Sequence, residues 1–126
     1  MRDFKDLQVW RKSHQLTLNV YRATEGFPRS ELFGLTSQIR RAASSIEANL
    51  AEGCGRTQAE FARFIQIALG SNCEVECHLL LARDLSLLPD ESHQRLLSQV
   101  EEVRRMLSAL LKTVRRPASV LTQDSA

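Results

Sequence analysis

The sequence predicts an all-α fold, an antiparallel up-and-down four-helix bundle that occupies residues 1–117. Apolar side chains recur at steps of three and four over four long segments, a spacing that places them on one face of a helix. Short breaks containing glycine or proline separate the segments, and connections this short make consecutive helices antiparallel neighbours. No segment shows the alternation of apolar and polar residues, bounded by turn residues, that is typical of a strand.

The first two predicted helices span about residues 6–24 and 30–52. Gly53 follows the second helix directly, where a glycine often ends a helix. Asn49 lies in the apolar seam of the second helix. A buried amide must be hydrogen-bonded to offset its desolvation, and in bundles such residues often fix the register between helices.

The third predicted helix has the clearest start signal in the chain. Thr57 and Glu60 fit a capping box, in which the threonine oxygen accepts from the Glu60 N–H while the carboxylate reaches back. The apolar pattern then continues to Leu88, a helix of about 45 Å. Gly70 inside it costs about 1 kcal/mol relative to alanine. We expect a close approach of two helices to be the reason, with a ligand pocket at Gly70 and Ser71 as the alternative.

The fourth predicted helix starts after Pro89, with Asp90 as its cap, and ends at Pro117. Its apolar stripe is the most regular in the chain. The following residues, 118–126, are small and polar, so we expect them to form a flexible tail.

A salt bridge is predicted between the third and fourth helices. Antiparallel pairing about the turn near Pro89 places Glu74 opposite Arg104, whose partly buried charge needs a partner. Arg40 is the second candidate partner of Glu74. We expect structural roles for Asn49, Glu52, Gly53, Gly70, Ser71, Glu74 and Arg104.

The composition favours a soluble cytoplasmic protein. Hydrophobic residues make up 43% and charged residues 25% of the chain, as in ordinary globular domains. The three cysteines cannot all pair within one chain and no secretory signal opens it, so we expect reduced thiols. The longest apolar run is far shorter than the about 20 residues of a membrane span, so we expect no membrane association.

No catalytic or metal-binding motif is recognisable, so we predict neither an enzyme nor a cofactor. Cys73 and Cys77 lie one helical turn apart and offer two ligands, whereas a tetrahedral site needs about four. We therefore expect buried or half-buried cysteines that pack as small apolar groups. The glycines before Thr57 lack the Lys-Ser/Thr pair of a phosphate loop and follow no strand. The three histidines have no Ser or Cys partner by spacing.

Several segments resemble one protein family. They are Phe4-Lys5-Asp6-Leu7-Gln8-Val9-Trp10, Phe33-Gly34-Leu35-Thr36-Ser37-Gln38-Ile39-Arg40-Arg41-Ala42-Ala43-Ser44-Ser45-Ile46, Asn49-Leu50-Ala51-Glu52-Gly53, and Gly70-Ser71 with Glu74. Together they resemble the four-helix-bundle family named for reading frames in intervening sequences of bacterial 23S rRNA genes. The accessory variability protein of diversity-generating retroelements is a more distant likeness.

The resemblance implies a homo-oligomer, a pentameric ring by analogy with known family structures, without established catalysis. It also implies nucleic-acid binding, a property attached to the retroelement relatives. The chain departs from the family at Asn72-Cys73 and Glu76-Cys77, where bulkier apolar residues are expected. This departure bears on the geometry of assembly.

Basic residues gather in two parts of the sequence. Residues 1–30 carry six Lys/Arg against three Asp/Glu, whereas residues 57–89 carry two against four. The end of the last helix is again basic. A solvated helix surface is the simpler explanation of such charges by themselves, but they also suit contacts with phosphate groups. The candidate nucleic-acid-binding residues are Arg11, Lys12, Arg22, Arg40, Arg41, Arg105, Lys112, Arg115 and Arg116.

A second apolar stripe on the third helix predicts a subunit interface. Its members are Leu69, Cys73, Leu80 and Leu87. The stripe lies about a quarter to a third of a turn from the core-facing residues. The alternative is a wide core face covered by a neighbouring helix.

The leading functional hypothesis is therefore a non-catalytic oligomer that binds RNA or DNA through basic patches. The alternative is a protein-interaction scaffold for a genetically linked partner. An enzyme with a concealed site comes third.

Overall fold

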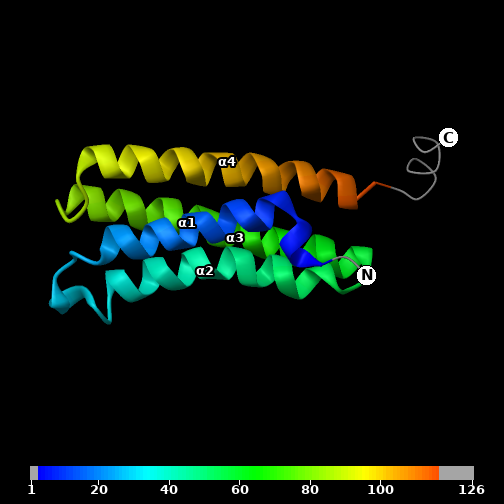
Figure 1. The fold of residues 1–126 in the computed structure, drawn as a ribbon, viewed down its shortest axis with the longest axis horizontal. Coiled ribbons are helices and arrows are strands. Elements are labelled where there is room, and N and C mark those ends of the chain that lie inside the picture. Colours follow the sequence, from blue (N-terminus) through cyan, green and yellow to red (C-terminus); the bar gives the residue numbers. More distant parts are fainter. Residues whose placement is uncertain (1–2, 117–126) are drawn as a thin grey trace.

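The computed structural model describes residues 3–116, which fold into four long helices. Single 3₁₀ turns, η1 and η2, precede the first and second helices, and no strand occurs within residues 3–116. The predicted all-α four-helix bundle is confirmed (Figure 1). In chain order the elements are η1 (Phe4–Asp6), α1 (Gln8–Thr24), η2 (Arg29–Glu31), α2 (Leu35–Cys54), α3 (Gln58–Asp84) and α4 (Asp90–Val114). The predicted tail, 118–126, lies outside the described residues.

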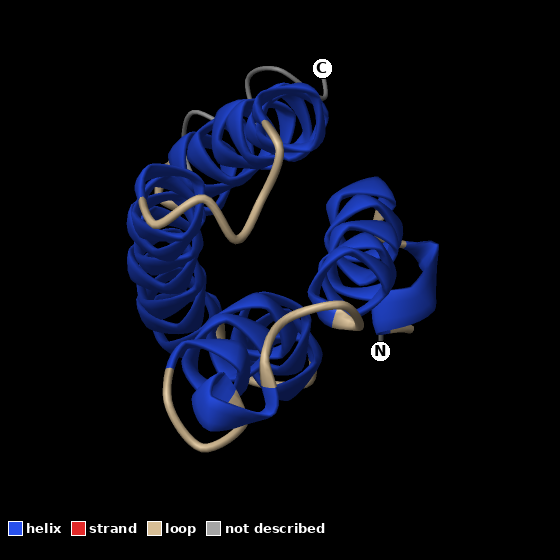
Figure 2. Cartoon of the chain, turned by 90° about the vertical axis from the view of Figure 1, so that its left-hand side faces the viewer, coloured by secondary structure: helices blue, strands red, loops and turns tan. Residues whose placement is uncertain are grey.

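Each helix packs against two neighbours, in the order α1, α2, α3, α4 and back to α1. Figure 2 looks along the helices and shows them around a common centre. Pairs across α2 and α3 show that these helices run in opposite directions. The hydroxyls of Ser45 and Ser71 are 2.8 Å apart, while the earlier Gln38 shares a groove with the later His78.

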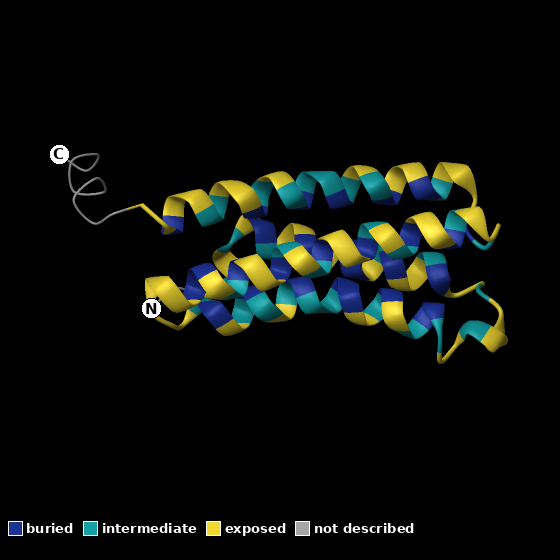
Figure 3. Ribbon diagram, turned by 180° about the vertical axis from the view of Figure 1, so that it is seen from behind, coloured by how far each residue is buried: buried dark blue, intermediate teal, exposed yellow. Residues whose placement is uncertain are grey.

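All four helices contribute to one core. Figure 3 shows buried and exposed positions alternating along each helix, as expected when one face is covered. Burying a side chain of leucine or isoleucine size contributes about 1.5–3 kcal/mol, so this core supplies most of the favourable free energy of folding. Its largest fully buried apolar side chains are Leu16, Ile39, Ile46, Leu50, Ile65, Leu79 and Leu107.

The start of α2 differs from the prediction. A 3₁₀ turn occupies residues 29–31, and α2 begins at Leu35. The Glu31 carboxylate accepts a hydrogen bond of 3.2 Å from the Leu35 N–H. This bond satisfies one of the free N–H groups of the first turn. A glutamate that caps from inside a preceding turn gives no recognisable sequence signal.

The end of α3 also differs from the prediction. The helix ends at Asp84 instead of Leu88, because Ser86 adopts a left-handed conformation with φ 62°. The Ser86 N–H donates to the Arg83 carbonyl and the Leu87 N–H to the Ala82 carbonyl, both at 2.9 Å. This is a Schellman motif, usually signalled by glycine at the left-handed position.

The capping box of α3 is confirmed in part. The Glu60 N–H donates to the Thr57 hydroxyl at 3.3 Å, as predicted. The Glu60 carboxylate accepts from that hydroxyl at 2.9 Å instead of from a backbone N–H. This hydrogen bond, followed by one from Arg56, lowers the pKa of Glu60. The interaction therefore stabilises the fold above the ordinary carboxyl pKa and is lost as the pH falls through the lowered value.

The predicted cap of α4 is wrong. Pro89 occupies the N-cap position, and Asp90 is the first residue of the helix and makes no capping hydrogen bond. Its carboxylate nevertheless lies in the first turn, where negative charge interacts favourably with the helix dipole.

Two glycines have roles that differ from those predicted. Gly53 lies within α2, whose C-cap is Gly55. A Cβ at Gly53 would stand 2.7 Å from the Cβ of Phe64, so Gly53 is where α2 and α3 approach closely. A Cβ at Gly70 would meet nothing within 4 Å, so none of the described helices makes the close approach predicted there.

The buried amide of the bundle is Asn72 and not Asn49. Asn49 is half-buried and donates to the carbonyl and hydroxyl of Ser45 on its own helix, at 2.8 and 3.0 Å. It therefore does not bridge two helices. Asn72 is 1% exposed and donates to the Val100 carbonyl of α4 at 3.1 Å. Its side-chain oxygen has no hydrogen-bond partner among residues 3–116. This amide links α3 to α4.

The Gly53→Ala variant should be less stable than the wild type. The added methyl group would clash with the Cβ of Phe64, which cannot move without its backbone, so α2 and α3 must move apart. Overpacking of this kind costs about 1–3 kcal/mol. Higher helix propensity offsets at most about 1 kcal/mol. Urea unfolding measures the difference. The matched control is Gly26→Ala, where a Cβ meets nothing within 4 Å, and an equal loss in both variants would contradict the packing role of Gly53.

Candidate functional site

The charges of the bundle are unevenly distributed between its two ends. Because the helices alternate in direction, one half of the bundle contains residues 3–16, 46–71 and 105–116. We call this the basic half. It carries nine Lys/Arg against five Asp/Glu, while the remaining described residues carry seven against nine. The formal charge of this half is therefore positive, which favours anions there.

The last part of α4 supplies most of the excess positive charge. Arg105, Lys112, Arg115 and Arg116 lie within residues 105–116, which contain no carboxylate, and we call these four residues the basic stripe. All four are exposed. Arg105 and Lys112 are seven residues apart in α4, so they share one face of the helix, and Arg115 and Arg116 directly follow its end at Val114. Within residues 3–116, Arg105, Lys112 and Arg115 form no ion pair.

Two of the predicted nucleic-acid-binding residues lie on α1 at the same end, but their side chains already have partners within the chain. Arg11 donates to the Lys5 carbonyl at 2.8 Å, and Lys12 pairs with Glu102 at 3.3 Å. Both are exposed, and exposed ion pairs are weak, at about 0–1 kcal/mol. These two cations therefore remain able to exchange their partners for a phosphate.

The other predicted basic residues do not join the stripe. Arg22 donates to Asn19 at 3.2 Å. Arg40 donates to the Thr24 hydroxyl at 2.8 Å and lies over the Tyr21 ring at 4.6 Å, so it ties α2 to α1. The structure therefore does not bring the nine candidates together. It places six of them in the basic half and leaves Arg22, Arg40 and Arg41 in the other half.

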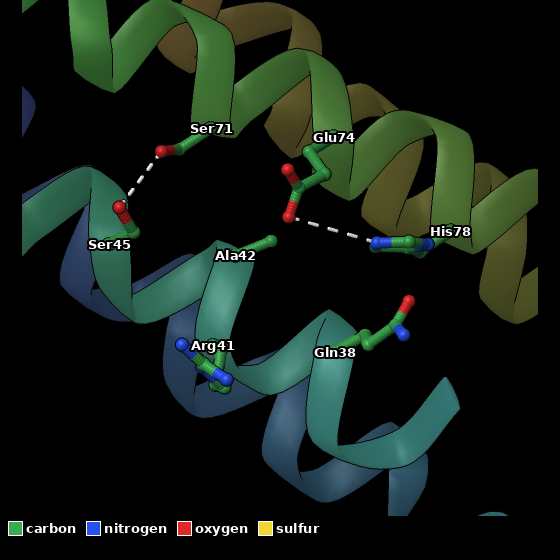
Figure 4. Close-up of a pocket in the computed structure, with 7 residues that line it drawn as sticks. All are labelled: Gln38, Arg41, Ala42, Ser45, Ser71, Glu74 and His78. Carbon is green, nitrogen blue, oxygen red and sulfur yellow. Dashed lines mark hydrogen bonds and ion pairs between the residues drawn. The ribbon is translucent and has the colours of Figure 1, made fainter. Parts of the chain in front are cut away.

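A groove of about 500 Å³ lies between α2 and α3. Figure 4 shows the Gln38 amide and the Glu74 carboxylate directed into the space between the two helices. The Ser45–Ser71 contact crosses the groove, and Glu74 pairs with His78 of its own helix at 3.8 Å. The lining residues are Gln38, Arg41, Ala42 and Ser45 from α2, and Ser71, Glu74 and His78 from α3.

The sequence prediction located only part of this groove. It noted a possible pocket at Ser71 but missed Gln38, Ser45 and His78. Their spacing contained the signal, because positions 38, 41 and 45 share one face of α2 and positions 71, 74 and 78 share one face of α3. The missing information was which of these two faces meet.

The predicted salt bridge joins the expected helices but uses a different glutamate. Arg104 pairs with Glu76 at 3.0 Å. Glu74 contacts neither Arg104 nor Arg40 within the described structure. Residues two positions apart on a helix point about 200° apart. Glu76 therefore faces α4, while Glu74 faces the α2 side.

The remaining structural candidates form local contacts. Glu52 pairs with Arg56 one turn further on, and both side chains are exposed. Such an exposed ion pair links the end of α2 to the turn before α3 and contributes little to stability. The Ser71 hydroxyl on α3 forms a hydrogen bond with the Ser45 hydroxyl on α2.

The cysteines are more exposed than predicted. Cys73 and Cys77 are both exposed on α3, and Cys54 is half-buried. They do not pack as core residues because positions 73 and 77 lie on the solvent side of α3. Within residues 3–116, no three His, Cys, Asp or Glu side chains gather as a metal site would require.

The predicted interface stripe on α3 is partly covered by the chain itself. Leu69 and Leu87 are half-buried and pack against the core, whereas Cys73 and Leu80 are exposed.

In the described part of the chain, none of the helices combines the length and apolar character that a membrane crossing needs.

Comparison with known proteins identifies a family and a fold. The model of the family described as 23S rRNA-intervening sequence protein matches residues 5–109. A similar solved structure is the 1.70 Å crystal structure of a protein with unknown function from the S23 ribosomal protein family of Bacteroides thetaiotaomicron VPI-5482. Its TM-score is 0.76 at 24% sequence identity, covering 82% of this chain and 95% of that chain, which shows a shared fold. No curated protein matches the chain.

A double-mutant cycle should find Arg104 coupled to Glu76 and not to Glu74. The partly exposed pair at 3.0 Å predicts a coupling of about 0.2–1 kcal/mol between Glu76→Gln and Arg104→Gln. The matched cycle of Glu74→Gln with Arg104→Gln should give a value near zero, because the two side chains point to different helices. Urea unfolding of the variants measures both. A larger coupling for Glu74 would reverse the assignment.

Proposed function

The chain belongs to the family of 23S rRNA-intervening sequence proteins, and on that premise we propose that it is a non-catalytic homo-oligomer that binds RNA or DNA. The basic stripe of α4 is the contact surface in this proposal. We place the assembly in the cytoplasm, with a pentamer as the subunit number that the family resemblance favours. The observation that carries the proposal is that three cations of the stripe, Arg105, Lys112 and Arg115, form no ion pair within residues 3–116.

Lysine and arginine without carboxylate partners are available for phosphate. Arg105, Lys112 and Arg115 form no ion pair within residues 3–116. A phosphate contact releases condensed counterions, and this release supplies most of the affinity of non-specific nucleic-acid binding. Each copy in an oligomer adds another stripe, so individually weak contacts sum by multivalency.

Helix stability alone does not account for the stripe. Cations in the last turn of a helix interact favourably with its dipole, which explains Lys112 and Arg115. Arg105 lies more than two turns before the end of α4 at Val114, where this effect has faded. Glu101 and Glu102 lie one turn before it. Arg105 nevertheless forms no ion pair within residues 3–116, so it remains available to an external anion.

The contacts should be independent of sequence. Specific readout requires side chains placed in a groove against base edges. The stripe consists of exposed cations on α4 and directly after its end, which suits phosphate oxygens. We therefore expect similar affinities for duplexes of different sequence.

Fluorescence anisotropy with labelled duplex RNA and duplex DNA, from about 50 to 200 mM salt, tests the proposal. The wild type should bind at the low end and weaken steeply with salt. The Arg105→Glu/Lys112→Glu variant should lose roughly tenfold or more in affinity and about 2 in the slope of log K against log salt. The matched control, Arg29→Glu/Arg95→Glu, makes the same charge change in the other half of the bundle and should bind nearly as the wild type does.

Two outcomes would contradict the proposal in different ways. Equal losses in both variants would show that net charge matters and that the stripe is not the site. Absence of binding to either nucleic acid at about 50 mM salt would remove the function itself. The protein-interaction scaffold would then take its place.

A further inference from the structure

The flank of α3 that faces α2 carries an exposed apolar row. Ile67, Leu81 and Leu85 are 42%, 46% and 53% exposed. At 100° per residue they fall within about 40° of one another. Gly70 and Glu74 lie on the same flank between them. Leu81 and the C-cap residue Leu85 lie one turn apart, and Ile67 lies about 21 Å before Leu81 on the same flank. Exposed apolar side chains that gather on one face are typical of a contact surface.

The outer face of the adjacent α2 has the opposite character. Ser37, Arg41, Ser44 and Ala48 follow one another at steps of four, three and four, so they share one face. Three of these four side chains are small. A helix with such a face can be approached closely by a row of larger side chains from another helix.

These two faces also carry opposite charges without strong partners. Arg41 is exposed and forms no ion pair within residues 3–116. Among the described residues, Glu74 pairs only with His78 of its own helix, at 3.8 Å. Arg41 and Glu74 line the same groove from opposite sides and do not pair with each other.

We propose that a second copy of this chain packs on this surface. The apolar row of α3 in one copy lies against the small-residue face of α2 in the other, and Arg41 of one copy faces Glu74 of the other. This inference rests on the oligomeric part of the proposed function and assigns its surface. The stripe of Leu69, Cys73, Leu80 and Leu87 offers a smaller surface, because only Cys73 and Leu80 are exposed in it.

Charge complementarity identifies the partner as another copy. One chain presents both members of each complementary pair, the small face with the apolar row and Arg41 with Glu74. No second kind of protein is needed to satisfy them. The proposal also explains Gly70, whose surroundings are empty within the chain. An interior glycine weakens a helix, and here it leaves room for the backbone of the neighbouring copy.

Sedimentation or light scattering at micromolar concentration tests the interface. The wild type should have a mass several times that of the 14.3 kDa chain. Leu81→Glu should lower the mass toward one chain. Leu18→Glu is the matched control, because Leu18 is 37% exposed on α1 and lies outside the proposed surface. It should leave the mass unchanged. Circular dichroism confirms that each variant is folded.

A charge exchange tests the predicted pair across the interface. Arg41→Glu and Glu74→Arg should each weaken assembly by placing like charges opposite one another. The double variant Arg41→Glu/Glu74→Arg should restore the wild-type mass, since the charges again meet their opposites. Loss of fold cannot produce such a rescue.

Three results would overturn the inference: a monomeric wild type, dissociation by Leu80→Glu but not by Leu81→Glu, or no rescue in the double variant. Nucleic-acid binding is measured separately and can fail independently. The Arg105→Glu/Lys112→Glu variant should retain the full oligomer mass while losing nucleic acid. If it loses both together, the stripe takes part in assembly and the assignment of the interface is wrong.

Discussion

The close approach of α2 to α3 is the constraint on which the other features depend. At Gly53 the two helices leave no room for a Cβ beside Phe64. Further along, the hydroxyls of Ser45 and Ser71 meet at 2.8 Å. Larger residues at these positions would separate the helices and reduce the dispersion contacts of the core. The same approach creates the groove lined by Arg41 and Glu74, so the packing that stabilises the bundle also shapes its outer surface.

The alternating direction of the helices has a second consequence, which is the separation of charge. The start of α1, the turn between α2 and α3, and the end of α4 come together at one end. Positive charges far apart in the sequence therefore share one half of the molecule, away from the Arg41–Glu74 groove. In the proposed account these two regions have different tasks, phosphate contact in the basic half and self-association at the groove. Assembly then multiplies the number of basic stripes without covering them.

The sequence predicted the helices and most of the core, because apolar periodicity reports directly which face is buried. It did not predict contacts that depend on the rotation of one helix against another. Helix register alone pairs Glu74 with Arg104, whereas it is Glu76 that faces α4. Asn49 fits the seam of α2, yet Asn72 is the buried amide. The sequence does not predict the Schellman motif at Ser86, because the left-handed residue of such a motif is usually glycine. The cluster of basic residues at the end of α4 can be recognised in the sequence. That Arg22, Arg40 and Arg41 lie in the other half of the bundle becomes clear only from the three-dimensional structure.

Amide chemical-shift mapping of the nitrogen-15-labelled oligomer with a short RNA duplex tests the account most directly. It compares the two surfaces in one experiment, since every described residue except proline carries a backbone amide. The account predicts that perturbations concentrate in residues 105–116 and the adjoining start of α1, and that they fade as salt is added. Residues 38–45 and 71–78 should shift little, because the neighbouring copy covers them. Perturbations centred on those two segments, with the end of α4 unchanged, would contradict the account.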